Sequence, residues 1–173
     1  MAQAKYFDAP EVADMAQKLI AKYHQHLIDY SVRIRYVFVD KTPNSQGKEV
    51  WGTCRKISGL NAYLEGENVD GEPFFVITIS KDIWDVLPPD KRLALVDHEL
   101  CHAWAEAKQQ KNESDDDSDM ETDNPVKLNI KPHDLEEFSC IVRRHGLWRE
   151  DIEAFVDEAL KCKNQTQNPT NNQ

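Results

Sequence analysis

The sequence lacks any long apolar run. Its most apolar stretch is short, FFVITI at residues 74–79, whereas a helix that spans a membrane needs about 20 consecutive apolar residues. The first ten residues, MAQAKYFDAP, also lack the apolar core of a signal peptide. These two absences argue against a membrane protein and lead us to expect a protein of the cytoplasm.

Cysteine is scarce, with four in 173 residues, and no two cysteines have the CxxC spacing that zinc ribbons and redox sites use. We expect Cys54, Cys101, Cys140 and Cys162 to be reduced thiols, as is usual in a cytoplasm. The chain has the length of one domain and can build a hydrophobic core without disulfides.

Basic residues are fewer than acidic ones. The sequence has 21 Lys and Arg against 31 Asp and Glu, which gives a net charge of −10. This balance argues against broad affinity for DNA or RNA, which usually needs a basic face. Much of the acidity lies in residues 113–123, ESDDDSDMETD, which include seven acids and no base. We expect a single domain over 1–162 with a mobile acidic insertion at 111–124, followed by a disordered polar tail at 163–173.

Hydrophobic periodicity predicts an α+β protein in which helices pack on a small sheet. The first predicted helix spans residues 8–28 and begins with a capping-box pattern of Asp8 and Glu11. The central helix is predicted to begin near Pro89 and to continue to residue 107. The predicted strands span 32–39, 49–57 and 74–80, and two further helices are predicted from Pro132 to Gly146 and over 149–161.

His98, Glu99 and His102 form an HExxH motif within the predicted central helix. Side chains four residues apart lie on one helix face about one turn apart, so the two imidazoles can converge on one ion. Zinc accepts imidazole nitrogen and prefers four ligands in a tetrahedron. Glu99 lies about 100° round the helix from His98, where its carboxylate can reach a metal-bound water without binding the metal. The motif therefore predicts a zinc site with Glu99 as the catalytic base.

A catalytic zinc normally has three protein ligands, so the motif needs one more. Ala105 and Lys108 stand where the metzincin extension needs Gly and His, which excludes that class. His133 is the preferred third ligand because it stands at the expected start of a helix, whose packed turns would hold it in place. Glu136 and Glu137, on the same predicted helix, remain alternatives.

Other histidines and cysteines fit this site less well. His24 and His26 lie on the predicted first helix, and His145 lies in a last helical turn, where its charge favours the helix dipole. Cys101 stands between the two motif histidines but points to a different helix face from His102. Together with Cys140 on the following predicted helix, Cys101 raises a structural zinc site of cysteine and histidine as an alternative.

Three acidic residues are candidates to orient the ligand rings by hydrogen bonds: Asp134, Asp97 and Glu106. The simpler interpretation of Asp134 is a charge at a helix terminus, and that of the other two is solvated surface. We favour the simpler interpretation for each.

The segments HELCHAW at 98–104 and HDLEEF at 133–138 resemble the phage metallopeptidase family. They are more distantly similar to SprT-like zincins, which also place a third histidine shortly before an aromatic residue. The strand-like segments before the motif fit the same pattern, so the resemblance covers about residues 10–160. It implies a minimal zincin-like fold with three or four strands, an amino-terminal helix, a central HExxH helix and two carboxy-terminal helices.

The resemblance also implies Zn²⁺ bound by His98, His102 and His133, with Glu99 as the general base. We therefore expect a zinc-dependent metallopeptidase that hydrolyses peptide bonds of a protein or peptide substrate, in a bacterial host cytoplasm if a phage encodes it. The alternative is a non-catalytic zinc-binding protein of a phage or prophage that interacts with a host protein.

Overall fold

The structure is a computed structural model of the whole chain. It describes residues 3–65, 71–108, 126–135, 139–147 and 150–167. The predicted acidic insertion, the alternative ligands Glu136 and Glu137, and the end of the polar tail lie outside these ranges. The chain divides into two compact units, residues 1–131 and residues 132–173.

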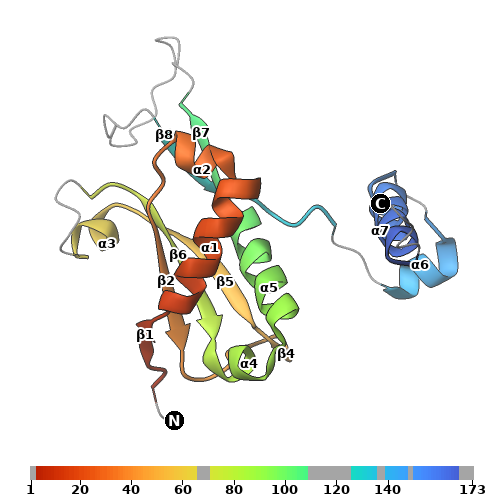
Figure 1. Cartoon of the computed structure of the whole chain (residues 1–173), viewed down its shortest axis with the longest axis horizontal. Coiled ribbons are helices and arrows are strands. Elements are labelled where there is room, and N and C mark those ends of the chain that lie inside the picture. Colours follow the sequence, from red (N-terminus) through yellow and green to blue (C-terminus); the bar gives the residue numbers. More distant parts are fainter. Residues whose placement is uncertain (1–2, 66–70, 109–125, 136–138, 148–149, 168–173) are drawn as a thin grey trace, which may run out of the picture. The chain divides into compact units, whose positions relative to one another are not determined.

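The first unit is built on a four-stranded sheet with the strand order β1-β2-β6-β5. The central strands β2 (Ile34–Val39) and β6 (Phe74–Ser80) are parallel. The edge strands β1 (Tyr6–Asp8) and β5 (Gly52–Ile57) pair antiparallel with β2 and β6 (Figure 1). The boundaries of β6 are those predicted from the sequence. Helices combined with this small sheet confirm the α+β class.

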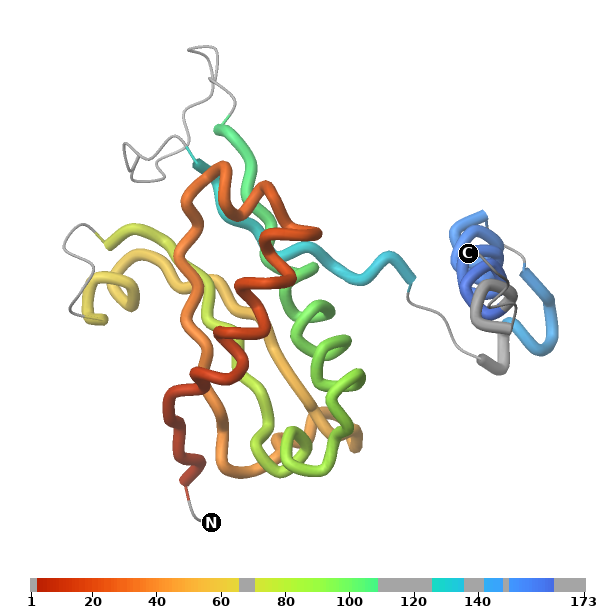
Figure 2. Tube along the Cα trace, viewed as in Figure 1, coloured from red at the N-terminus to blue at the C-terminus, as the bar shows by residue number. Residues whose placement is uncertain are grey.

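Two helices, α1 (Pro10–Tyr23) and α5 (Pro89–His102), lie side by side on one face of the sheet (Figure 1, Figure 2). Alternate residues of the strands face them, because side chains alternate along a strand. Burial of each large side chain contributes about 1.5–3 kcal/mol, so this core holds the motif helix firmly on the sheet. Its members include Val12, Ala16, Leu19, Val96 and Leu100 from the helices and Phe38, Phe75, Ile77 and Ile79 from the strands.

Shorter elements complete the first unit. They are α2 (Gln25–Asp29), β3 (Asn44–Ser45), β4 (Lys48–Glu49), α3 (Leu60–Tyr63), α4 (Lys81–Val86), β7 (Ala103–Ala107) and β8 (Val126–Ile130). Strands β3 and β4 pair with each other, and β7 pairs antiparallel with β8. Among the helices in the described ranges, none is long and apolar enough to cross a membrane.

The second unit contributes α6 (Ser139–His145) and α7 (Glu150–Gln167) to the described part of the chain. Helix α7 continues six residues beyond its predicted end, to Gln167. Residues 132–135 are not helical, so the prediction that a helix begins at Pro132 is wrong. A proline also suits the position after a strand, because it has no N–H for the ladder, and β8 ends two residues earlier.

The motif helix begins where the sequence predicts but ends at His102, five residues early. Ala103 and Ala105 are buried, whereas Trp104 between them is exposed, which is the alternation of a strand. The β7–β8 ladder pairs Ala103 with Ile130 and supplies the hydrogen bonds that further helical turns would have made. Pairing between distant segments therefore overrides the helix propensity of the alanines.

The first helix is shorter than predicted and is interrupted. Asp8 lies in β1, and the N-cap residue is Ala9 without a side-chain hydrogen bond, so the capping box with Glu11 is not formed. The chain leaves the helical conformation at His24 (φ −123°, ψ 49°), and α2 begins at the next residue. The interruption separates two helices where the sequence predicts one.

Candidate metal centre

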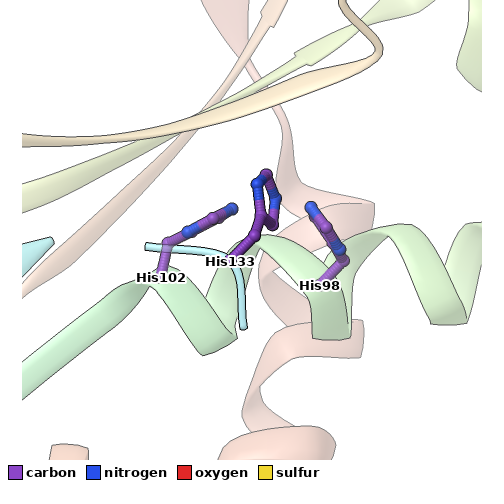
Figure 3. Close-up of side chains that lie close together, drawn as sticks. All are labelled: His98, His102 and His133. Atoms are coloured by element: carbon purple, nitrogen blue, oxygen red, sulfur yellow. The ribbon is translucent and has the colours of Figure 1, made fainter. Parts of the chain in front are cut away.

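The two histidines of the HExxH motif project from the same side of α5, close to its carboxyl end. The ring centroids of His98 and His102 are 5.1 Å apart, and the ring planes meet at 84°. Figure 3 shows both rings above the helix. His98 is exposed and His102 is half-buried, so a metal ion could approach both from solvent.

The backbone of Lys131 fixes the orientation of the His102 ring. The Lys131 N–H donates to the His102 carbonyl oxygen at 2.9 Å, and His102 Nδ1 lies 2.7 Å from the Lys131 carbonyl oxygen. A carbonyl oxygen can only accept, so Nδ1 is the donor. In the neutral ring Nε2 is then the unprotonated nitrogen, which is the form that binds a metal.

His133 comes from the non-helical segment that follows β8, two residues after Lys131. Two residues of chain span at most about 7 Å, so the bonds between Lys131 and His102 keep His133 close to the motif. One donor nitrogen from each of His98, His102 and His133 lies within 4.8 Å of the other two (Figure 3). The structure thus gathers the predicted residues into a three-histidine cluster, although His133 is not at the start of a helix.

The three-histidine cluster fits a zinc ion. Nitrogens bound at about 2.0–2.1 Å in a tetrahedron lie about 3.3 Å from one another. Small side-chain rotations bring donors that start within 4.8 Å to that spacing. Three imidazoles leave one tetrahedral position for water or substrate, which is typical of catalytic rather than structural zinc sites.

Glu99 is buried, with 4% of its surface exposed. Burial raises the pKa of its carboxyl group to about 7, because the charged form loses its water. A Cβ atom at Gly52 would lie 2.5 Å from Glu99 Oε1, so a side chain at this position of β5 would displace the carboxylate. Gly52 was not among the site residues that the sequence predicted. Its signal was a glycine inside a predicted strand, which often marks a close approach.

A groove of about 510 Å³ runs along α5 and the beginning of β5. His98 and Glu99 form part of its wall, together with Gly52 and Trp51. In the described part of the sheet β5 pairs only with β6, so the groove lies beside a strand edge without a partner strand. The rest of the wall is formed by Glu49, Val50, Lys91, Ala94 and Leu95.

Two of the three acidic candidates for orienting the ligand rings, Asp97 and Glu106, bond to other residues. Asp97 Oδ1 accepts a hydrogen bond from His24 Nε2 at 2.7 Å. Glu106 accepts one from Asn129 Nδ2 at 2.9 Å, across the β7–β8 pair. Asp134 is exposed. The backbone carbonyl of Lys131, which the sequence did not single out, orients the ring of His102.

The histidines that the sequence analysis set aside have other surroundings. His26 Nε2 donates to the carbonyl oxygen of Ala103 at 3.1 Å, and its ring centroid lies 4.7 Å from that of Trp104. These contacts of His26 connect α2 to β7. His145 is the last residue of α6.

A family model described as "Putative phage metallopeptidase" matches residues 4–159. The chain belongs to this family. The match includes the HExxH motif, Gly52 and His133, and it confirms the resemblance that the sequence suggested over about residues 10–160. No curated protein and no solved structure matches the chain.

Membership of the phage metallopeptidase family adds a class of reaction to the geometry. The family name points to a peptidase that uses a metal ion, and the three-histidine cluster is a candidate site for that ion.

Proposed function

We propose that this member of the phage metallopeptidase family is a zinc-dependent peptidase whose three-histidine cluster holds the ion. The observation that carries the proposal is the gathering of three imidazole donors within 4.8 Å, next to a buried carboxylate in an open groove. Hydrolysis needs both a base and room for substrate, whereas a structural zinc site needs neither. The alternative of a non-catalytic zinc protein has no comparable support.

The ligands in this proposal are His98, His102 and His133. Neutral imidazoles would leave the full charge of the ion to act on water and substrate. A bound zinc ion supplies Lewis-acid chemistry, because it acidifies water and polarises a carbonyl oxygen. The hydrogen bond from His102 Nδ1 to Lys131 would keep that ring in the tautomer that binds metal.

Glu99 would move the proton. One of its carboxylate oxygens accepts a proton as water attacks the peptide carbonyl, and later donates it to the leaving nitrogen. In the metal-free chain, burial raises the pKa of this carboxyl group, which favours its uptake of a proton. Gly52 would hold the carboxylate in position by leaving room for it.

The substrate in this proposal is an extended peptide that lies in the groove beside β5. Its main chain would pair with the open edge of β5 near Gly52, as in β-augmentation. Trp51, 45% exposed, and Leu95 offer apolar contacts to the side chains of such a peptide. The proposal therefore predicts cleavage of unfolded chains more readily than of folded ones.

Glu99→Gln tests the proposal, since glutamine has nearly the shape of glutamate but cannot take up the proton. We expect E99Q to bind zinc as the parent chain does and to cleave a denatured protein about 10²–10⁴-fold more slowly. The control is Glu11→Gln, which removes an exposed carboxylate from α1, outside the groove, and should leave the rate unchanged. Zinc-loaded E99Q that cleaves at the parent rate would overturn the proposal.

A further inference from the structure

Helix α5 carries a second pair of metal-binding side chains at the same four-residue spacing. Asp97 and Cys101 precede His98 and His102 by one position each, so their face lies about 100° round the helix. His24 reaches this face from the interruption between α1 and α2, and α1 lies beside α5 (Figure 2). One donor atom from each of His24, Asp97 and Cys101 lies within 4.8 Å of the other two. We call these residues the His24 cluster.

We propose that the His24 cluster is a second metal site, which binds a divalent transition-metal ion such as zinc and ties the α1–α2 junction to α5. The site uses none of the residues of the three-histidine cluster, so it does not depend on the proposed peptidase activity.

The packing of His24 gives the first support. Its side chain is almost fully buried, and Nε2 lies 2.7 Å from Asp97 Oδ1. The helical conformation is interrupted at this residue, as the fold shows. A histidine–aspartate hydrogen bond alone would account for the pair. It would not account for the third donor nearby, Cys101, which lies one turn further along α5. A metal ion would account for all three.

The donor chemistry gives the second support. Nitrogen, oxygen and sulfur together suit zinc or cobalt, whereas magnesium and calcium prefer oxygen alone. A neutral imidazole, a carboxylate and a thiolate would together balance the charge of a divalent ion. Because Cys101 is exposed and Asp97 partly exposed, water can reach the fourth position.

The geometry requires only a small adjustment. In a tetrahedral zinc site with bonds of about 2.0–2.3 Å, the ligand atoms lie about 3.3–3.8 Å apart. The hydrogen-bonded atoms of His24 and Asp97 start closer than this, at 2.7 Å, and the Cys101 donor starts within 4.8 Å of both. The ion would replace the proton that His24 and Asp97 share and draw in the thiolate.

Cobalt titration of the metal-free full chain tests this inference, because a cobalt ion bound to a thiolate has a strong charge-transfer absorption in the near ultraviolet. We expect this absorption in the parent and its loss in Cys101→Ser. Asp97→Asn should weaken the cobalt affinity of this site at least about tenfold, since even the hydrogen-bond partners of metal ligands contribute that much. The matched control is Cys162→Ser, which removes an exposed thiol from α7 and should leave the absorption unchanged.

His98→Ala separates this inference from the proposed function. It should keep the thiolate absorption even though it impairs the three-histidine cluster. Each variant is compared with the parent by circular dichroism, so that loss of the fold is not mistaken for loss of a ligand. The inference is wrong if the folded parent shows no thiolate absorption with cobalt, or if folded C101S shows it unchanged.

Discussion

The three-histidine cluster and the His24 cluster lie on the same helix, and each uses a pair of α5 residues four apart, yet their surroundings differ. The first has a groove of about 510 Å³ beside it and the buried carboxylate of Glu99 next to it. The second has a buried histidine from the interruption between two helices. The spacing on the helix is therefore not what indicates catalysis. A base and room for substrate distinguish the first cluster from the second.

The largest expected effect comes from removing the third ligand of the three-histidine cluster. Compared with the parent chain, His133→Ala should bind zinc at the three-histidine cluster at least about 100-fold more weakly, because two imidazoles cannot hold the ion alone. Hydrolysis should be abolished. Competition with a chelating dye measures the affinity. His145→Ala, the control, changes a histidine at the end of α6 and should leave both quantities unchanged.

Unchanged zinc affinity in H133A would contradict the assignment of this ligand. The alternative ligands would then be Glu136 and Glu137, and a glutamine variant of each would identify the one that binds.

The next effect sharpens the comparison by moving the base without removing it. Gly52→Ala places a Cβ about 2.5 Å from Glu99 Oε1, so the carboxylate must shift. We expect kcat to fall about 10–100-fold with zinc content unchanged, because a displacement of about 1 Å can have that effect. Thr53→Ala, at the next position of β5, is the control, since adjacent strand residues point to opposite faces. A G52A variant as active as the parent would show that Gly52 does not position Glu99.

A smaller effect concerns the stability of the metal-free chain. The Glu99 carboxyl group has a pKa of about 7 in the folded chain, against 4.5 for an ordinary glutamate. Between these pH values the unfolded chain has lost a proton that the folded chain keeps, so the free energy of unfolding falls as the pH rises from about 4.5 to about 7. Above that range the buried charge destabilises the fold by on the order of 3 kcal/mol.

Glu99→Gln should remove this pH dependence, because glutamine carries no charge. Urea unfolding of the metal-free chains should show E99Q to be more stable than the parent at pH 8, with the difference much reduced at pH 4. Parallel pH profiles for the two chains would mean that the folded carboxyl group titrates at its ordinary pKa.

Local patterns in the sequence predicted most of the first unit. The run FFVITIS has the boundaries of β6, because a central strand buried among its neighbours reads as a continuous apolar run. The end of α5 was not predictable from the chain itself. Alanine favours a helix, and only pairing with β8, whose residues lie 19 to 27 positions further along the chain, turns Ala103–Ala107 into a strand.

The residues of the candidate site also divide into those that the sequence predicted and those that it did not. His98, Glu99 and His102 follow from a five-residue motif, whereas His133 was expected at the start of a helix that does not begin there. Gly52 did not follow, because its contact with Glu99 depends on how β5 lies against α5. His24 did not follow either, because the sequence places it within a continuous helix, and the interruption appears only in the structure.

The most direct test of the central claim is a crystal structure of the zinc-loaded full chain, with the ion located by anomalous scattering. We predict zinc bound to His102 Nε2 and to ring nitrogens of His98 and His133, with its fourth position occupied by water and open to the groove beside Glu99. Zinc held by a fourth protein ligand, or bound away from these three histidines, would contradict the account.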